Sequence, residues 1–171
     1  MNVATIKYQS VGNFDGISTS LYVSGCSHAC RGCFNKETWN RNYGYLYTEE
    51  VENEILKSLD NPYVKTLVLL GGEPLMSYNI DPLIGLCQRV KNELSFPKRI
   101  VLFSGFTFEE IVKNEHRLKL LKEVDVLIDG RFEEDKHSLK LKWRGSSNQR
   151  VLHVPASLKE MKAIPYYSEE C

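Results

Sequence analysis

The sequence lacks long apolar runs and has no excess of charge of either sign. No stretch approaches the ~20 apolar residues of a membrane-spanning helix, and the first 18 residues lack the apolar core of a secretion signal. Lys plus Arg equals Asp plus Glu at 22 each, which gives no basic footprint for nucleic acid or for a membrane surface. We therefore expect a cytoplasmic protein that binds neither nucleic acid nor a membrane.

Cysteine is also scarce, with five in 171 residues. The count is odd and three of the five are clustered, which is not the pattern of a disulfide scaffold. Of the other two, Cys87 occupies an apolar-face position of an expected helix and is interpreted as an ordinary core thiol. Cys171 is interpreted as a solvated terminal thiol. The clustered cysteines are the ones to explain.

These three, Cys26, Cys30 and Cys33, have the spacing Cys-x3-Cys-x2-Cys. They follow the β-like run 21–25, so they lie just past the carboxyl end of an expected strand, where loops of α/β proteins carry their chemistry. Three thiolates from one loop can hold three irons of a [4Fe–4S] cluster. The fourth iron would lack a ligand from this motif, and an open coordination position is what a catalytic metal site needs.

A structural zinc site is the alternative for these cysteines. Zinc usually takes four ligands, often from two Cys-x2-Cys-like pairs, and the second pair is missing from this sequence. His28 could be the fourth ligand, but it lies inside the triplet, where reaching the same metal is awkward; otherwise it packs over the cluster. The spacing favours an iron–sulfur cluster over zinc.

The rest of the chain alternates strands and helices. Buried-strand patterns at 19–24, 64–70, 99–103 and 124–128 are separated by helical patterns, with a period of roughly thirty residues. This alternation predicts an α/β fold with a parallel sheet. A closed eight-unit barrel typically needs ~250 residues, so the chain can make only a partial, open (βα) barrel, for which we expect about six units.

Three local predictions concern the elements beyond this framework. A helix is expected at 81–94, with Pro82 suited to its first turn. The alternation of apolar and polar residues at 139–143 is typical of a half-exposed strand. A single domain is expected over 1–154, followed by a poorly anchored tail at 155–171.

Candidate functional residues follow the strands at their carboxyl ends. Gly71-Gly72-Glu73-Pro74, Ser104-Gly105 and Asp129-Gly130 each come directly after an expected strand. Each could be a plain turn or a solvated charge pair, but glycines also let a ligand approach the backbone closely. Because the carboxyl ends of parallel strands share one edge, we expect these residues and the cysteine loop to form one rim.

Two of these motifs resemble those of a known superfamily. Gly25-Cys26-x3-Cys30-x2-Cys33-Phe34-Asn35 resembles the radical S-adenosylmethionine (SAM) motif, and Gly71-Gly72-Glu73-Pro74 resembles the motif that binds the methionine amino group. More narrowly, the chain resembles the activating enzymes of anaerobic (class III) ribonucleotide reductase. The stretches that carry this resemblance are 33–39, 125–132 and 143–149. It extends to about Val154 and leaves the tail unexplained.

The resemblance implies a radical SAM fold with the cluster at the carboxyl rim of the sheet. Cys26, Cys30 and Cys33 would ligate three irons, and the amino and carboxylate groups of SAM would chelate the fourth. The residues expected to contact SAM are Gly32, Cys33, Phe34, Gly71, Gly72, Glu73, Ser104 and Asp129. Of these, the segment around Cys33 would lie against the adenine and the Gly-Gly-Glu segment would hold the methionine end.

The implied activity is that of an oxidoreductase. The reduced cluster would pass one electron to the sulfonium of SAM, giving methionine and a 5′-deoxyadenosyl radical. That radical would take hydrogen from a glycine of the large subunit of the anaerobic reductase, and a flavodoxin-like protein would supply the electron. Two alternatives stay open: an activase of another glycyl-radical enzyme, of the formate-lyase type, and a non-enzymatic zinc-binding interaction module.

Overall fold

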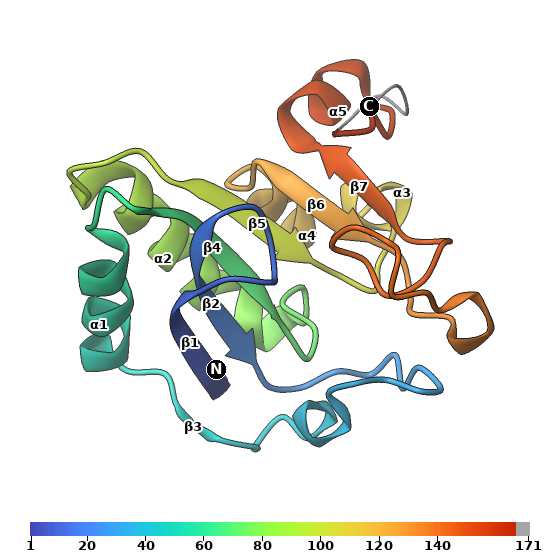
Figure 1. The fold of residues 1–171 in the computed structure, drawn as a ribbon, viewed down its shortest axis with the longest axis horizontal. Helices are drawn as coiled ribbons and strands as arrows, with labels where there is room; N and C mark the ends of the chain where they lie inside the picture. The colour runs from blue at the N-terminus through green and yellow to red at the C-terminus, as the bar shows by residue number, and fades with distance from the viewer. Residues whose placement is uncertain (167–171) are drawn as a thin grey trace.

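A seven-stranded sheet carries its helices on one face (Figure 1). The computed structural model describes residues 1–166. The strands are β1 (Asn2–Ser10), β2 (Ile17–Val23), β3 (Tyr45–Leu46), β4 (Val64–Gly71), β5 (Arg99–Phe103), β6 (Val126–Asp129) and β7 (Arg150–His153). The α-helices are α1 (Glu49–Leu59), α2 (Ser77–Glu93), α3 (Phe108–Val112), α4 (Glu115–Leu121) and α5 (Val154–Glu160), and short 3-10 helices η1 (Lys36–Trp39) and η2 (Glu134–Lys136) lie in loops.

The predicted parallel sheet is confirmed for its centre and wrong for its edges. Across the sheet the order is β3-β1-β2-β4-β5-β6-β7, and β2, β4, β5 and β6 are mutually parallel. β1 and β3 extend one edge antiparallel, and β7 extends the other. β1 joins β2 through a short turn, and a connection of that length can only pair strands antiparallel. The curvature of an open barrel of about six units stays a prediction.

The central strands are apolar along their length because both of their faces are covered. Leu67 and Leu69 of β4 belong to the core beneath the helices. Val68 and Leu70 point to the opposite face, into a smaller core that includes Phe14. Successive side chains of a strand alternate between faces, so only a continuous apolar run fills both cores. None of the helices within residues 1–166 is long and apolar enough to cross a membrane.

The helix expected at 81–94 begins four residues earlier, at Ser77. Pro82 therefore lies inside α2 instead of in its first turn. The buried side chain of Asn79 explains the early start, because its amide donates to the carbonyls of Ser24, at 3.1 Å, and Glu73, at 3.0 Å. These bonds fix the first turn of the helix against two loops of the rim. The stabilisation they give outweighs the loss of the one backbone hydrogen bond that proline removes.

The predicted strand at 139–143 is wrong. This segment consists of turns and bends, and Leu139 is 93% exposed. A strand needs a partner edge, and the free edge of β6 is taken by β7. Trp143 instead packs its ring on Phe14, with 4.3 Å between centroids. An alternating pattern alone does not supply the missing partner.

The part of the tail that the structure describes is packed, contrary to the expectation of poor anchoring. Residues 154–160 form α5, in which Val154 and Ser157 are buried. The backbone N–H of Tyr166 donates to the carbonyl of Val151 at 2.9 Å, so the chain returns to β7. Cys171 lies outside the described residues.

A pair of leucines tests the double-sided packing of the sheet. Leu69→Ala removes a side chain with no exposed area and should lower the free energy of unfolding by about 2–5 kcal/mol. Leu139→Ala removes the same atoms from a side chain that is 93% exposed and should change it by less than about 0.5 kcal/mol. Urea denaturation of both variants measures the difference. Equal effects would contradict the assignment of Leu69 to the core.

Candidate metal centre

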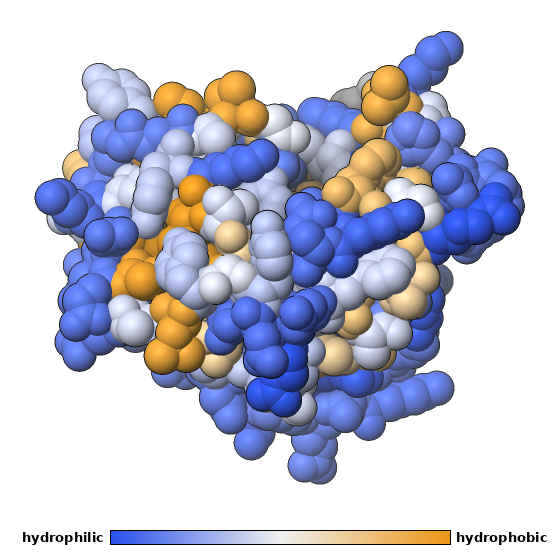
Figure 2. All heavy atoms as spheres, turned by 90° about the horizontal axis from the view of Figure 1, so that it is seen from below, coloured by the Kyte–Doolittle hydropathy of each residue, from blue (hydrophilic) through white to orange (hydrophobic). Residues whose placement is uncertain are grey.

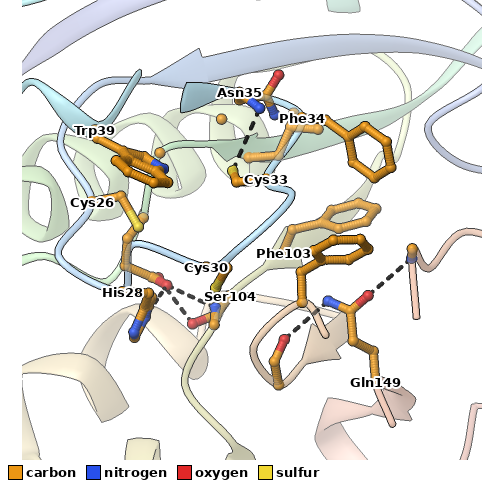
Figure 3. A pocket seen from close by; sticks show the side chains of 18 residues that line it. Cys26, His28, Cys30, Cys33, Phe34, Asn35, Trp39, Phe103, Ser104 and Gln149 are labelled. Carbon is orange, nitrogen blue, oxygen red and sulfur yellow. Dashed lines mark hydrogen bonds and ion pairs between the residues drawn. The ribbon is translucent and has the colours of Figure 1, made fainter. Parts of the chain in front are cut away.

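The loops that follow the four parallel strands meet around one cavity of about 240 Å³ (Figure 3). Parallel strands place their carboxyl ends at a single edge, so residues far apart in the sequence become neighbours there. The cavity is lined by Cys26 after β2, Gly72 after β4, Ser104 after β5 and Gly130 after β6. The shared rim predicted from the sequence is confirmed at these positions.

All three clustered cysteines line this cavity as free, partly buried thiols. Burial raises the pKa of Cys26 to about 11 and also raises the pKa of Cys30. Burial thus disfavours the thiolate form of both side chains, and because a metal binds the thiolate, metal binding would have to release their protons. The backbone N–H of Asn35 lies 3.4 Å from Sγ of Cys33 and orients this sulfur. Cys87 lies in the core beneath the helices, as expected for a packing thiol.

The Gly-Gly-Glu loop is pressed against the start of the cysteine loop. The backbone N–H of Gly72 donates to the carbonyl of Val23 at 2.7 Å, and that of Glu73 donates to the carbonyl of Gly25 at 2.8 Å. A Cβ at position 72 would lie 2.7 Å from the carbonyl oxygen of Gly25. Only glycine fits there, because any side chain would push the two loops apart.

Glu73 is buried, and its carboxylate is fully used by protein donors. Oε1 accepts the backbone N–H of Leu75 and the hydroxyl of Ser104, each at 2.9 Å. Oε2 accepts the backbone N–H of Gly105 at 2.7 Å and lies 2.9 Å from Nε2 of His28. Because a carboxylate only accepts, Nε2 of His28 is the donor. One side chain thus joins the loops after β2, β4 and β5.

His28 is held in place on its other side as well. Its side chain is 6% exposed, and its ring meets the edge of Phe106 at 4.4 Å between centroids. A Cβ at position 105 would lie 2.4 Å from the ring of His28, so Gly105 makes room for the imidazole. His28 therefore packs against the loop after β5 and bonds to Glu73.

Asp129 has a different place from the one expected for a cofactor contact. Its carboxylate is 1% exposed, accepts the backbone N–H of Phe108 at 2.7 Å, and pairs with Nε of Arg150 at 2.9 Å. Its neighbour Gly130 lines the cavity, but Asp129 does not. In this arrangement Asp129 fixes α3 and β7 at the rim.

The remaining wall comes from the segment between β6 and β7. The amide of Gln149 donates to the carbonyl of Gly130 at 2.9 Å and accepts the backbone N–H of Gly145 at 2.9 Å. Phe34 faces this wall and lies 5.2 Å, between ring centroids, from Phe132. The loop that the sequence singled out at 143–149 therefore closes one side of the cavity.

Most of the residues predicted to bind the cofactor lie on this cavity. Those that line it are Cys26, Cys30, Cys33, Phe34, Gly71, Gly72, Glu73 and Ser104, whereas Gly32 and Asp129 do not. Several other residues, for which no individual site role was predicted, also line it, among them Trp39, Phe103 and Gln149. Trp39 and Gln149 lie within the stretches that carry the resemblance, which is the signal that could have identified them.

The donor set fits an iron–sulfur cluster. The three thiols have no disulfide partner and face one cavity, and soft sulfur is the ligand that such clusters take. Within residues 1–166, no three His, Cys, Asp or Glu side chains converge closely enough to hold a single metal ion. A cluster makes a different demand, because each thiolate binds a separate iron.

Comparison with known proteins supports an iron–sulfur cluster domain. The family model of the 4Fe-4S single cluster domain matches residues 13–152. The chain is 39% identical over 153 residues to the anaerobic ribonucleoside-triphosphate reductase-activating protein of Pasteurella multocida (strain Pm70), covering 88% of this chain and 96% of the relative. It is 41% identical to the protein of that name from Enterobacteria phage T4, over 81% and 85% of the two chains. For Escherichia coli (strain K12) the identity is 37%, over 83% and 92%.

These matches extend over most of the chain and well beyond the cysteine loop. The chain therefore belongs to the 4Fe–4S single cluster domain family and, within it, to the anaerobic ribonucleoside-triphosphate reductase-activating proteins.

The role of Glu73 in linking the loops after β2, β4 and β5 can be tested without any cofactor. Glu73→Gln replaces one carboxylate oxygen by an NH₂ group, which cannot accept from the donors around it. Leaving such buried donors unsatisfied should lower the free energy of unfolding by about 1–3 kcal/mol. Glu160→Gln, at an exposed position of α5, should change it by less than about 0.5 kcal/mol. Similar urea midpoints for the two variants and the parent would show that Glu73 does not join these loops.

Proposed function

We propose that this chain is a radical SAM activating enzyme that generates a glycyl radical on the anaerobic ribonucleotide reductase. The observation that carries the proposal is the meeting of three free thiols and a Gly-Gly-Glu loop in one cavity. Relatives of similar length bear the name of reductase-activating proteins, which supports the choice of partner.

Cys26, Cys30 and Cys33 would hold one [4Fe–4S] cluster, leaving the fourth iron to the amino and carboxylate groups of SAM. The chemistry that such a cluster would supply is one electron to the sulfonium of SAM, which would break a C–S bond and give methionine and a 5′-deoxyadenosyl radical. That radical would take a hydrogen atom from a glycine Cα of the reductase and become 5′-deoxyadenosine. Overall, SAM would gain one electron from the cluster and a second with the hydrogen atom of the glycine, while the glycine would be oxidised by one electron, in keeping with an oxidoreductase.

The chain's own residues bind and orient SAM. The backbone of Gly71 and Gly72 would receive the methionine end, and Cys33 and Phe34 would lie against the adenine. Gly32, which does not line the cavity, would act only through its neighbour Cys33. Glu73 and Ser104 hold the methionine-side loop in position, because their polar atoms are already bonded to each other and to neighbouring backbone. Asp129 would act only indirectly, because its neighbour Gly130 lines the cavity and Asp129 does not.

The mouth of the cavity suits a macromolecular substrate. Phe34 is 67% exposed and lines both the thiol cavity and a neighbouring one that Leu139, which is 93% exposed, also lines. Exposed apolar side chains around an opening are typical of a protein-binding surface. A glycine-bearing segment of the reductase would enter there, and a flavodoxin-like protein would deliver the electron.

The cysteines give the most direct test of the activity. Cys26→Ala, Cys30→Ala and Cys33→Ala should each abolish the glycyl-radical signal that the reconstituted, reduced protein generates on the reductase with SAM. Cys87→Ala removes a thiol from the core and should retain the signal. Electron paramagnetic resonance of the mixture measures it.

Other outcomes of the same experiment would redirect the assignment. A radical on a formate-lyase-type enzyme and none on the reductase would identify a different partner. About one equivalent of zinc, with no sulfide, would indicate the interaction module instead. If any of the three alanine variants retains the signal, the assignment of that cysteine as a cluster ligand is wrong.

His28 should act as a positioning residue through its bond to Glu73. His28→Ala leaves the three thiols in place but removes the bond that links the cysteine loop to the methionine-side loop. The Kd for SAM should therefore rise about tenfold, measured at equal iron and sulfide content. His28→Gln keeps an N–H donor and should recover part of this loss. Titration of SAM into the reduced protein measures both. An unchanged Kd in the alanine variant would exclude this role.

A further inference from the structure

Trp39 presents a buried polar atom that has no partner in the protein. Six buried side-chain nitrogen or oxygen atoms of residues 1–166 lack a hydrogen-bond partner, and Nε1 of Trp39 is one of them. Of these six residues, Trp39 alone lines the thiol cavity. Indole N–H groups usually find an acceptor when they are buried, so this one calls for an explanation.

The position of the indole is fixed by the backbone around it. Trp39 ends the short helix η1, and its carbonyl accepts the backbone N–H of Cys26 at 3.2 Å. The carbonyl of Thr38 accepts the N–H of Gly25 at 2.7 Å. Both bonds tie η1 to the first residues of the cysteine loop. Figure 3 shows the ring beside Cys26.

We propose that the indole N–H of Trp39 donates a hydrogen bond to the group bound in this cavity. The proposal rests on the proposed function, because it takes that group to be the cluster with SAM. Two acceptors have the required chemistry: a sulfur of the cluster or of its thiolates, and the carboxylate of SAM. The backbone of η1 contacts both neighbours of these groups: the carbonyl of Trp39 accepts from Cys26, and a Cβ at position 72 would lie 3.0 Å from the carbonyl oxygen of Thr38. Cys26 is proposed to hold the cluster and the Gly72 loop to hold SAM.

The two acceptors make different predictions for Trp39→Phe, which removes the N–H and retains an aromatic ring. A lost hydrogen bond to sulfur makes the cluster harder to reduce, so the reduction potential measured without SAM should become more negative. A lost hydrogen bond to the carboxylate leaves that potential unchanged and raises the Kd for SAM about tenfold. Either result supports the donor role and identifies the acceptor.

Trp143→Phe is the matched control, since Trp143 is the other tryptophan of the chain and does not line the thiol cavity. It should alter neither quantity. Iron and sulfide contents and the thermal midpoint of each variant establish that the proteins compared are folded and loaded. If Trp39→Phe matches the parent in both potential and Kd, the N–H has no such acceptor and the proposal is wrong.

Failure of the proposed function would look different from failure of this inference. If the parent protein holds a cluster but binds no SAM, the proposed activating function is wrong. The potential of Trp39→Phe would still report on an N–H bond to the cluster in that case.

Discussion

The geometry of the site depends on the hydrogen bonds that the buried carboxylate of Glu73 accepts. This carboxylate takes four donors from three loops that the sequence separates by up to 77 residues, from His28 to Gly105. A buried carboxylate is costly unless it is fully bonded, so the loops cannot move apart without exposing it or leaving it unsatisfied. The cysteine loop is therefore held at a fixed distance from the loop proposed to receive methionine. This rigidity is what a site needs if it must place one reactive bond next to one iron.

Much of the fold could be predicted because its signals are local. The apolar runs of the parallel strands and the glycines that follow them are legible in the sequence, and they place the rim correctly. The missed features depend on partners elsewhere in the chain. The segment 139–143 has a strand-like pattern but no free edge to pair with, and β1 is a strand because β2 offers it an edge. The start of α2 is fixed by Asn79 bonding to residues of two other loops.

In the site, too, the features encoded locally could be predicted and those that depend on distant residues could not. The cysteine spacing predicts the cluster ligands, because three sulfurs in one short loop need no tertiary information to be brought together. The sequence did not show which of the other residues contact the cavity and which hold the loops in place. Asp129 was expected to meet the cofactor, but its carboxylate is taken by Arg150 and the start of α3. The significance of His28 comes from its contact with Glu73, and that of Trp39 from its place in the cavity wall, and both depend on the tertiary structure.

The central claim is that SAM binds directly to an iron that the protein leaves open. Electron–nuclear double resonance of the reduced, reconstituted protein with SAM labelled with ¹⁵N at its amino group tests this most directly. The account predicts a nitrogen coupling that requires bonding to the cluster and that unlabelled SAM shows at the ¹⁴N frequency instead. An intact [4Fe–4S] signal with no such coupling, at saturating SAM, would contradict it.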